Sequence, residues 1–259
     1  MKLFFCQCRA LVRLSLLELW RRNDIFGLLV LALALLVPLS AMRPFGASGA
    51  VRYVDEVALL LVWGYSLFIS LGTGARAFPP EFESRTIYPL LAKPVSRGAL
   101  LVGKYLGACT ASLSALAFFY LLFVLSCAFR GTMPGVDLVQ AFVLHAAFVA
   151  LAVALAMLGS LLVTPSANLT LMAILLGGMF FFGRRLPAYA ETAGGALKAL
   201  VLAAYGLAPH AEFFDMRQRV IHGWGAVEPG VFLAVLAYAI VYVTVVLLLA
   251  RFVLGRRRL

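Results

Sequence analysis

The sequence predicts an all-α, polytopic membrane protein with six transmembrane helices. Of its 259 residues, 64% are hydrophobic and only 13% are charged, and the mean hydropathy is +1.01. A soluble domain of this length could not bury so much apolar surface, because a substantial part of its surface must stay in contact with water. The net charge of +11 comes from basic residues that flank the apolar runs, which indicates membrane anchoring rather than nucleic-acid binding.

Six apolar runs have about the 17–25 residues that a bilayer core requires. Apart from residues at their ends, such as Asp24 and Arg251, the runs contain no Asp, Glu, Lys or Arg. A helix that is apolar on all sides is typical of a membrane span. The expected spans are Asp24–Met42, Val57–Ala75, Tyr105–Phe129, Leu138–Val163, Ala167–Gly183 and Pro229–Val253.

The basic residues predict the topology, since they concentrate on the cytoplasmic side of a membrane protein. The segment before the first span, the loop between the second and third spans, and the C-terminus are basic, whereas the first and third loops hold only Arg43, Arg52 and Arg130. Both termini are therefore expected in the cytoplasm. The loop at 184–228 also carries basic residues, but it is long enough to be translocated despite them.

Two connecting segments contain further apolar sequence. Residues 1–23 mix Leu and Trp with Arg, which predicts an interfacial elbow helix on the inner leaflet or a plain topology anchor. The apolar patch Ala196–Leu207 is too short to span, so it suits a re-entrant or a packed extracellular helix that Pro209 ends. The whole chain, 1–259, is expected to form one transmembrane domain.

The cytoplasmic loop at 76–104 predicts a short, rigid helix. Pro79 and Pro80 favour a helix start, and Glu81 and Glu83 suit the positive end of a helix dipole. The helix is expected at about Pro80–Tyr88, and Pro89 should kink or end it. A knob of this kind would fit a cleft in a soluble partner, although a solvated loop that only satisfies the charge rule explains the same residues.

This loop resembles the one between the second and third spans of type-2 ABC transporter permeases. The shared pattern is an acidic residue, an Arg-Thr pair, a Leu-Leu pair, Pro-Val-Ser-Arg, and Gly-Lys before the next span. Its members here are Glu81, Glu83, Arg85, Thr86, Leu90, Leu91, Pro94, Val95, Ser96, Arg97, Gly103 and Lys104. The later loop is similar to the family's P-x-x-x-x-F-D-x-R pattern through Pro209, Phe213, Phe214, Asp215 and Arg217. Within the family, the pattern is similar to the permease that serves nitrous-oxide-reductase maturation.

The resemblance implies a permease subunit of an ABC exporter in a bacterial inner membrane. Two copies of a cytoplasmic ATPase would hold ATP and Mg²⁺, so that no catalytic residue, metal or cofactor is expected on this chain. Glu81, Glu83 and Arg85 would pair with charges of the ATPase, and Thr86 and Ile87 would pack there. Lys93, Pro94 and Arg97 would hold the loop against the spans. A second permease copy and the bilayer are the other expected partners, and an extracytoplasmic accessory protein stays open.

Two motifs resemble enzyme signatures without their context. Gly98–Tyr105 nearly matches a phosphate-binding loop, but Tyr105 replaces the small hydroxyl that holds magnesium and no strand precedes it. Gly46–Gly49 reads G-x-S-G, as in rhomboid-type proteases, yet the predicted last span offers no histidine base. We expect no enzyme activity from either motif.

The histidines and cysteines allow both structural and functional interpretations. His145 in the fourth span is expected to bond to a neighbouring helix, although an intramembrane histidine is also a functional candidate. His210 and His222 flank Glu212 and Asp215, which suits solvated loop chemistry better than a metal site. Cys109 and Cys127 would lie about 27 Å apart on one helix, too far to pair. A stand-alone secondary transporter or channel is the alternative function, and it would normally show ionisable residues or broken helices at mid-membrane.

Overall fold

The computed structural model describes residues 48–80, 96–131 and 135–256, together with Val12, Val30 and Met133. This part of the chain is helical throughout, with turns and short 3-10 segments but no β-strand. The predicted first span, Asp24–Met42, and the elbow segment, 1–23, lie outside the described residues except for Val30 and Val12. The total of six spans therefore stays a prediction.

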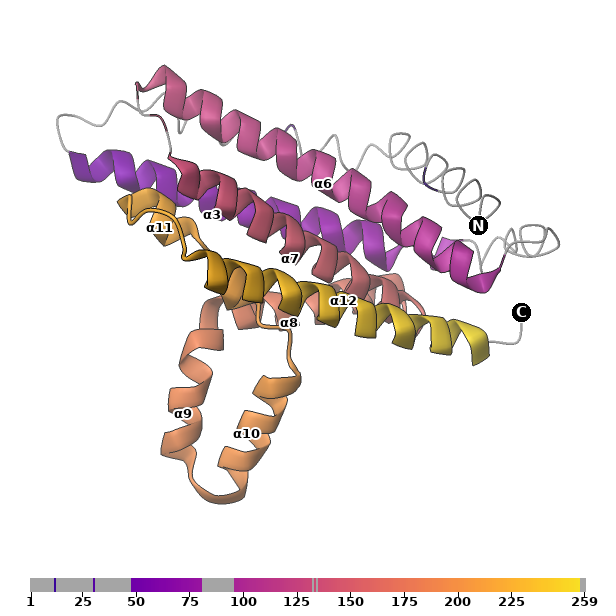
Figure 1. The fold of residues 1–259 in the computed structure, drawn as a ribbon. Helices are drawn as coiled ribbons and strands as arrows, with labels where there is room; N and C mark the ends of the chain where they lie inside the picture. Colours follow the sequence, from indigo (N-terminus) through magenta and orange to yellow (C-terminus); the bar gives the residue numbers. More distant parts are fainter. Residues whose placement is uncertain are drawn as a thin grey trace.

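The other five predicted spans are helices. Their observed bounds are α3 Ser48–Ala75, α6 Arg97–Phe129, α7 Val136–Ser160, α8 Pro165–Phe182 and α12 Pro229–Arg256. Within the described residues, five helical stretches are long and apolar enough to cross a membrane. The longest helices lie side by side, with α7 between α3, α6 and α12 (Figure 1).

The start of α6 differs from the sequence prediction. Residues 97–104 were expected in the loop, but they form the first turns of α6, so this helix begins eight residues before the predicted span at Tyr105. Ser96 explains the early start, because its side chain caps the helix by accepting a hydrogen bond from the Ala99 amide at 3.1 Å. The whole Gly98–Tyr105 motif is therefore helical and cannot form a phosphate-binding loop.

The segment at 184–228 folds into short helices. They are η1 Gly183–Arg185, α9 Leu186–Ala193, α10 Gly195–Leu207, η2 Ala211–Phe214 and α11 Arg217–His222. α10 coincides with the predicted apolar helix and ends before Pro209, as expected. Gly194 and Gly195 have positive φ angles of 66° and 53° and make the turn between α9 and α10. These two helices form a hairpin that projects sideways from the bundle (Figure 1).

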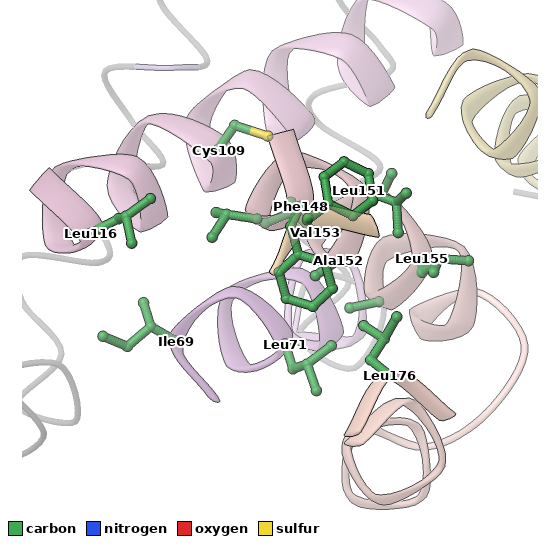
Figure 2. Close-up of a cluster of buried hydrophobic side chains, with 14 of the residues drawn as sticks. Ile69, Leu71, Cys109, Leu116, Phe148, Leu151, Ala152, Val153, Leu155 and Leu176 are labelled. Carbon is green, nitrogen blue, oxygen red and sulfur yellow. The ribbon is translucent and has the colours of Figure 1, made fainter. Parts of the chain in front are cut away.

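The bundle core is centred on α7. Phe148, Leu151, Ala152 and Val153 of this helix are buried against apolar side chains of α3, α6 and α8 (Figure 2). By contrast, the buried residues of α12 form one narrow stripe, Ala239, Val246, Ala250 and Leu254. The outward faces of α6, α8 and α12 expose large apolar side chains, as lipid-facing helices do.

Candidate functional site

The bundle has two ends, which we name by their residues. At the Lys104 end, α6 begins while α3, α7 and α12 end. At the Asp55 end, α6 ends while α3, α7 and α12 begin. The predicted coupling loop belongs to the Lys104 end, and the 184–228 segment enters from the Asp55 end.

Lys104 fastens the two helices that flank the coupling loop. It lies in the second turn of α6 and is 6% exposed, and its Nζ donates a 2.6 Å hydrogen bond to the Ala77 carbonyl just beyond α3. The ammonium also lies 5.3 Å from the centre of the fully buried Phe78 ring. The end of α3 and the start of α6 are thereby held together.

Arg97 connects the same loop to α12. Its Nη1 donates to the carbonyl oxygens of Leu254 at 3.1 Å and Gly255 at 2.8 Å, in the last turn of α12. These carbonyls have no partner within the helix, and a cation is favoured at this negative end of the helix dipole. The described ends of the loop segment 76–104 are thus held on α3, α6 and α12.

The predicted coupling residues divide into two groups. Arg97, Gly103 and Lys104 belong to α6, where the structure brings them to one end of the bundle. The remaining ones lie outside the described residues, so their predicted roles stay predictions; they are Glu81, Glu83, Arg85, Thr86, Ile87, Lys93 and Pro94.

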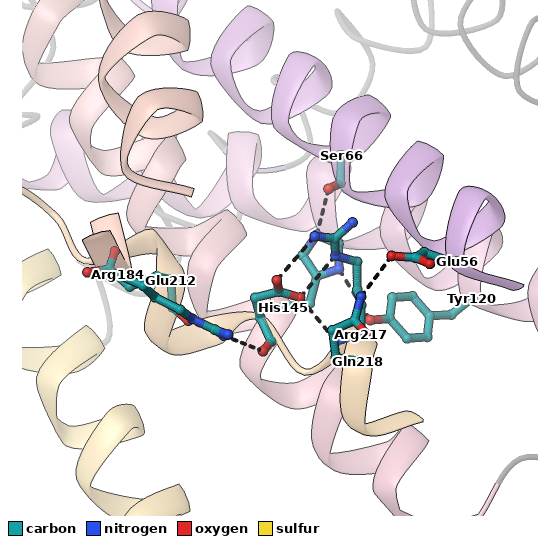
Figure 3. A network of polar contacts seen from close by, with 9 residues as sticks. Glu56, Ser66, Tyr120, His145, Arg184, Glu212, Arg217 and Gln218 are labelled. Atoms are coloured by element: carbon teal, nitrogen blue, oxygen red, sulfur yellow. Dashed lines mark hydrogen bonds and ion pairs between the residues drawn. The ribbon is translucent and has the colours of Figure 1, made fainter. Parts of the chain in front are cut away.

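A buried polar cluster joins α3, α6 and α7 at the middle of the bundle. His145 is fully buried, and its Nε2 lies 2.6 Å from the Ser66 hydroxyl while its Nδ1 lies 3.3 Å from the Tyr120 hydroxyl (Figure 3). Ser66 also donates to the Trp63 carbonyl at 2.9 Å, so the consistent arrangement has Nε2–H donating to Ser66 and Nδ1 accepting from Tyr120. The imidazole stacks on the Trp63 ring, with centres 4.5 Å apart.

Because both ring nitrogens of His145 have a hydrogen-bond partner on another helix, this cluster, the His145 clamp, stabilises the packing of α7 against α3 and α6. We expect His145→Leu to lower the free energy of unfolding by about 1 kcal/mol, the usual scale for interhelical hydrogen bonds. Unfolding in mixed micelles would measure the change. Thr170→Ala is the matched control, since the Thr170 hydroxyl is exposed and bonds only to its own helix. Equal effects of the two variants would contradict the clamp.

The predicted Asp215 and Arg217 form an ion pair beside this cluster. The guanidinium donates from Nε to Oδ1 at 3.0 Å and from Nη2 to Oδ2 at 3.2 Å, and it lies 4.6 Å from the Phe180 ring centre. Figure 3 shows Arg217 close to His145 and Tyr120. A two-pronged pair of this kind neutralises both charges and fixes their orientation.

The other residues of the predicted loop pattern also meet here. Phe214 is buried and packs on Phe148, with ring centres 5.9 Å apart, while Phe213 stacks on His210 at 4.7 Å. Pro209 is buried immediately after α10. Since Phe148 is the central residue of α7, the 184–228 segment reaches the middle of the bundle rather than lying beyond its end.

Glu212 was expected from the sequence to be a solvated loop residue, but it is buried. It is 4% exposed, and its Oε1 accepts hydrogen bonds from Tyr205 and His210, each at 3.1 Å. Its Oε2 packs against Gly183, where a Cβ would lie 2.5 Å away. Burial and the hydrogen bond to Glu212 raise the pKa of Tyr205 above its ordinary value. Across the described residues there is no cluster of three or more His, Cys, Asp or Glu that could hold a metal.

The sequence indicated His145 and Lys104 as notable residues, but it did not predict which side chains they contact or that Lys104 is buried. Ser66 and Tyr120 were not predicted to meet His145, and Lys104 was expected at the membrane edge rather than buried. One available signal was the spacing of Ser66, Ser70 and Thr73, which places hydroxyls on one face of α3. Thr73 indeed contacts Ser112 of α6 at 3.0 Å.

These features define a multi-pass helical membrane protein with a buried polar cluster around His145 and with helix ends joined by Lys104 and Arg97 at the Lys104 end. The family model for the ABC-2 family transporter protein matches residues 22–257. The chain therefore belongs to the ABC-2 transporter family, and it is a permease-type membrane subunit. Comparison with curated proteins gave no match.

Proposed function

We propose that this chain is the membrane-spanning subunit of an ATP-driven exporter that works with two copies of a separate cytoplasmic ATPase. ATP and Mg²⁺ would be held by that ATPase, and this chain would hydrolyse nothing. The supporting observation is that Lys104 and Arg97 tie the described flanks of this loop to α3, α6 and α12. A partner that displaces such a loop would move three helices at once.

The loop residues have distinct roles in this proposal. Glu81, Glu83 and Arg85 would pair with charges of the ATPase, while Thr86 and Ile87 would pack in its cleft. Lys93 and Pro94 would shape the loop beside Arg97. The Lys104 end would then face the cytoplasm, with both termini on that side of a bacterial inner membrane.

Two copies of the chain would enclose the transport pathway. The family resemblance is the basis for proposing a second copy and an outward direction of transport. It is also the basis for the subgroup, which is similar to the nitrous-oxide-reductase maturation permease. α10 would be re-entrant, because its contacts lie at the level of the middle of α12. An accessory protein on the outer side remains compatible with this arrangement.

The test is recovery of the ATPase with the tagged full chain from its native host in mild detergent. We expect one ATPase per permease in the wild type. Glu83→Ala with Arg85→Ala should lower the recovered ATPase about tenfold or more, since lost charge pairs at an interface cost at least about 2 kcal/mol.

The matched control removes one charge of each sign elsewhere on the surface. Arg185 and Glu191 are exposed at the α9 hairpin, so Arg185→Ala with Glu191→Ala should leave ATPase recovery unchanged. Failure to recover any ATPase, even after crosslinking, would contradict the proposed function and favour a stand-alone transporter.

A further inference from the structure

α12 is tied to the rest of the bundle at two separate levels. Among the described residues, the hydrogen bonds from α12 to other elements involve Leu254 and Gly255 at one level and Tyr238 and Tyr242 at the other. The first level is the contact with Arg97 at the Lys104 end. The second level is the contact with the hairpin segment.

The second level joins α12 directly to α10 and η2. The Tyr242 hydroxyl donates to the carbonyl of Leu207, the last residue of α10, at 3.1 Å. The His210 amide donates to the Tyr238 hydroxyl at 3.1 Å, and the Tyr238 ring lies 5.9 Å from the rings of both His210 and Phe213. The base of the hairpin is therefore held by two tyrosines one turn apart on α12.

Between these levels, no hydrogen bond or ion pair joins α12 to another of the described helices. Its buried stripe consists of small or aliphatic residues, and no proline interrupts the helix after Pro229. Tyr242 and Leu254 are 12 residues apart, which is about 18 Å along a helix. A rigid helix that packs through one narrow apolar stripe is suited to small sliding motions, because no hydrogen bond between these two levels has to break.

We propose that α12 transmits movement of the coupling loop to the α9–α10 hairpin, with Arg97, Tyr238 and Tyr242 as the positioning residues. A displacement of the start of α6 would pull the last turn of α12 through Arg97. The same displacement would reach Leu207 and His210 through the two tyrosines. Figure 1 shows α12 passing the base of the hairpin and ending where α6 begins. This inference rests on the proposed function, because the movement originates at the ATPase.

The test uses the full complex of this chain with its ATPase in lipid nanodiscs, with Cys6→Ser and Cys8→Ser to remove the two cysteines near the N-terminus. Cys109 and Cys127 are buried and stay in place. A bimane fluorophore is attached at L200C on the exposed face of α10, or at L121C on the exposed face of α6. The emission shift between the nucleotide-free and the ATP–vanadate-trapped complex is measured for each label.

In the otherwise unchanged chain, both labels are expected to respond to trapping. Y238F with Y242F should reduce the L200C shift about threefold or more, the scale of a lost interhelical hydrogen bond, while ATPase turnover and the L121C shift stay unchanged. R97Q should reduce the L200C shift as well. Combining R97Q with Y242F should add no further loss, because both residues act through the same helix.

Two matched controls separate transmission from general damage. Y189F removes an exposed hydroxyl from α9, and R256Q removes an exposed cation that stacks on Phe252 of its own helix. Both variants should keep the full L200C shift. A full L200C shift in Y238F with Y242F, or additive losses with R97Q, would overturn the role of α12. No response from either label in the unchanged complex would instead overturn the proposed function, and the inference with it.

Discussion

Replacing Arg130 by methionine is expected to lower the free energy of unfolding by about 3 kcal/mol. Arg130 follows α6 and its Nη2 forms an ion pair with Asp55 of α3, which joins the two helices at the Asp55 end. The side chains of Arg130 and Asp55 are only 12% and 18% exposed. Removing the cation alone leaves a carboxylate with little water around it, and this desolvated charge dominates the cost.

A double-mutant cycle measures that cost. Asp55→Asn with Arg130→Met removes both charges, so the double variant should be more stable than Arg130→Met by about 1–2 kcal/mol. Unfolding is followed by tryptophan fluorescence, to which Trp63 in the bundle core contributes, as SDS is added to mixed micelles. Arg52→Met is the control, because Arg52 is exposed at the start of α3. A double variant no more stable than Arg130→Met would mean that the ion pair is not the source of the loss.

Much of the fold could be predicted from sequence because lipid imposes a simple requirement. A span needs an uninterrupted apolar run of sufficient length, and such runs are visible without knowing the packing. The end of α6 at Phe129 and the start of α12 at Pro229 were predicted to the residue. The start of α6 was not, since residues up to Lys104 were assigned to the charged loop, while the cap from Ser96 and the burial of Lys104 favour a helix.

The position of the 184–228 segment along the axis of the bundle was harder to predict. Asp215 and Arg217 are charged, and charged residues normally indicate a loop in water. The structure pairs them in two hydrogen bonds and places Arg217 against the Phe180 ring, which permits a position beside buried helices. Such pairing depends on the tertiary structure, so no sequence pattern indicates it.

The candidate site likewise has features that the sequence predicts and features that depend on the packing of the helices. His145 was predicted to bond to a neighbouring helix, and it does contact α3 and α6. Its particular partners depend on how the helices are rotated about their axes. The hydroxyls of Ser66, Ser70 and Thr73 indicate this rotation for α3, whereas a span that is apolar on all sides does not specify it.

Two glycines on α3 illustrate this limit and give the second large prediction. Gly72 and Gly74 are equivalent in the sequence, yet only Gly74 lies against α7. A Cβ at Gly74 would be 2.7 Å from the Ala156 Cβ and 2.9 Å from the Val153 carbonyl oxygen, whereas a Cβ at Gly72 would meet nothing within 4 Å. Small residues allow membrane helices to approach closely, and Gly74 has this role.

We expect Gly74→Ala to destabilise the protein by about 1–3 kcal/mol, because the new methyl group must push α3 away from the backbone of α7. Gly72→Ala adds the same methyl group to open space, so it should be neutral or stabilise α3 by up to about 1 kcal/mol through helix propensity. The same SDS titration measures both variants. Similar stabilities for the two would show that α3 and α7 do not meet at Gly74.

The Gly74 contact also has a consequence for coupling. It lies one turn before Ala77, which accepts the hydrogen bond from Lys104, so a shift of α3 would disturb the anchor of the coupling loop. Gly74→Ala should therefore reduce ATPase recovery in the pull-down, while Gly72→Ala should not. Loss of stability without loss of ATPase binding would indicate that the loop is anchored by α6 and α12 alone.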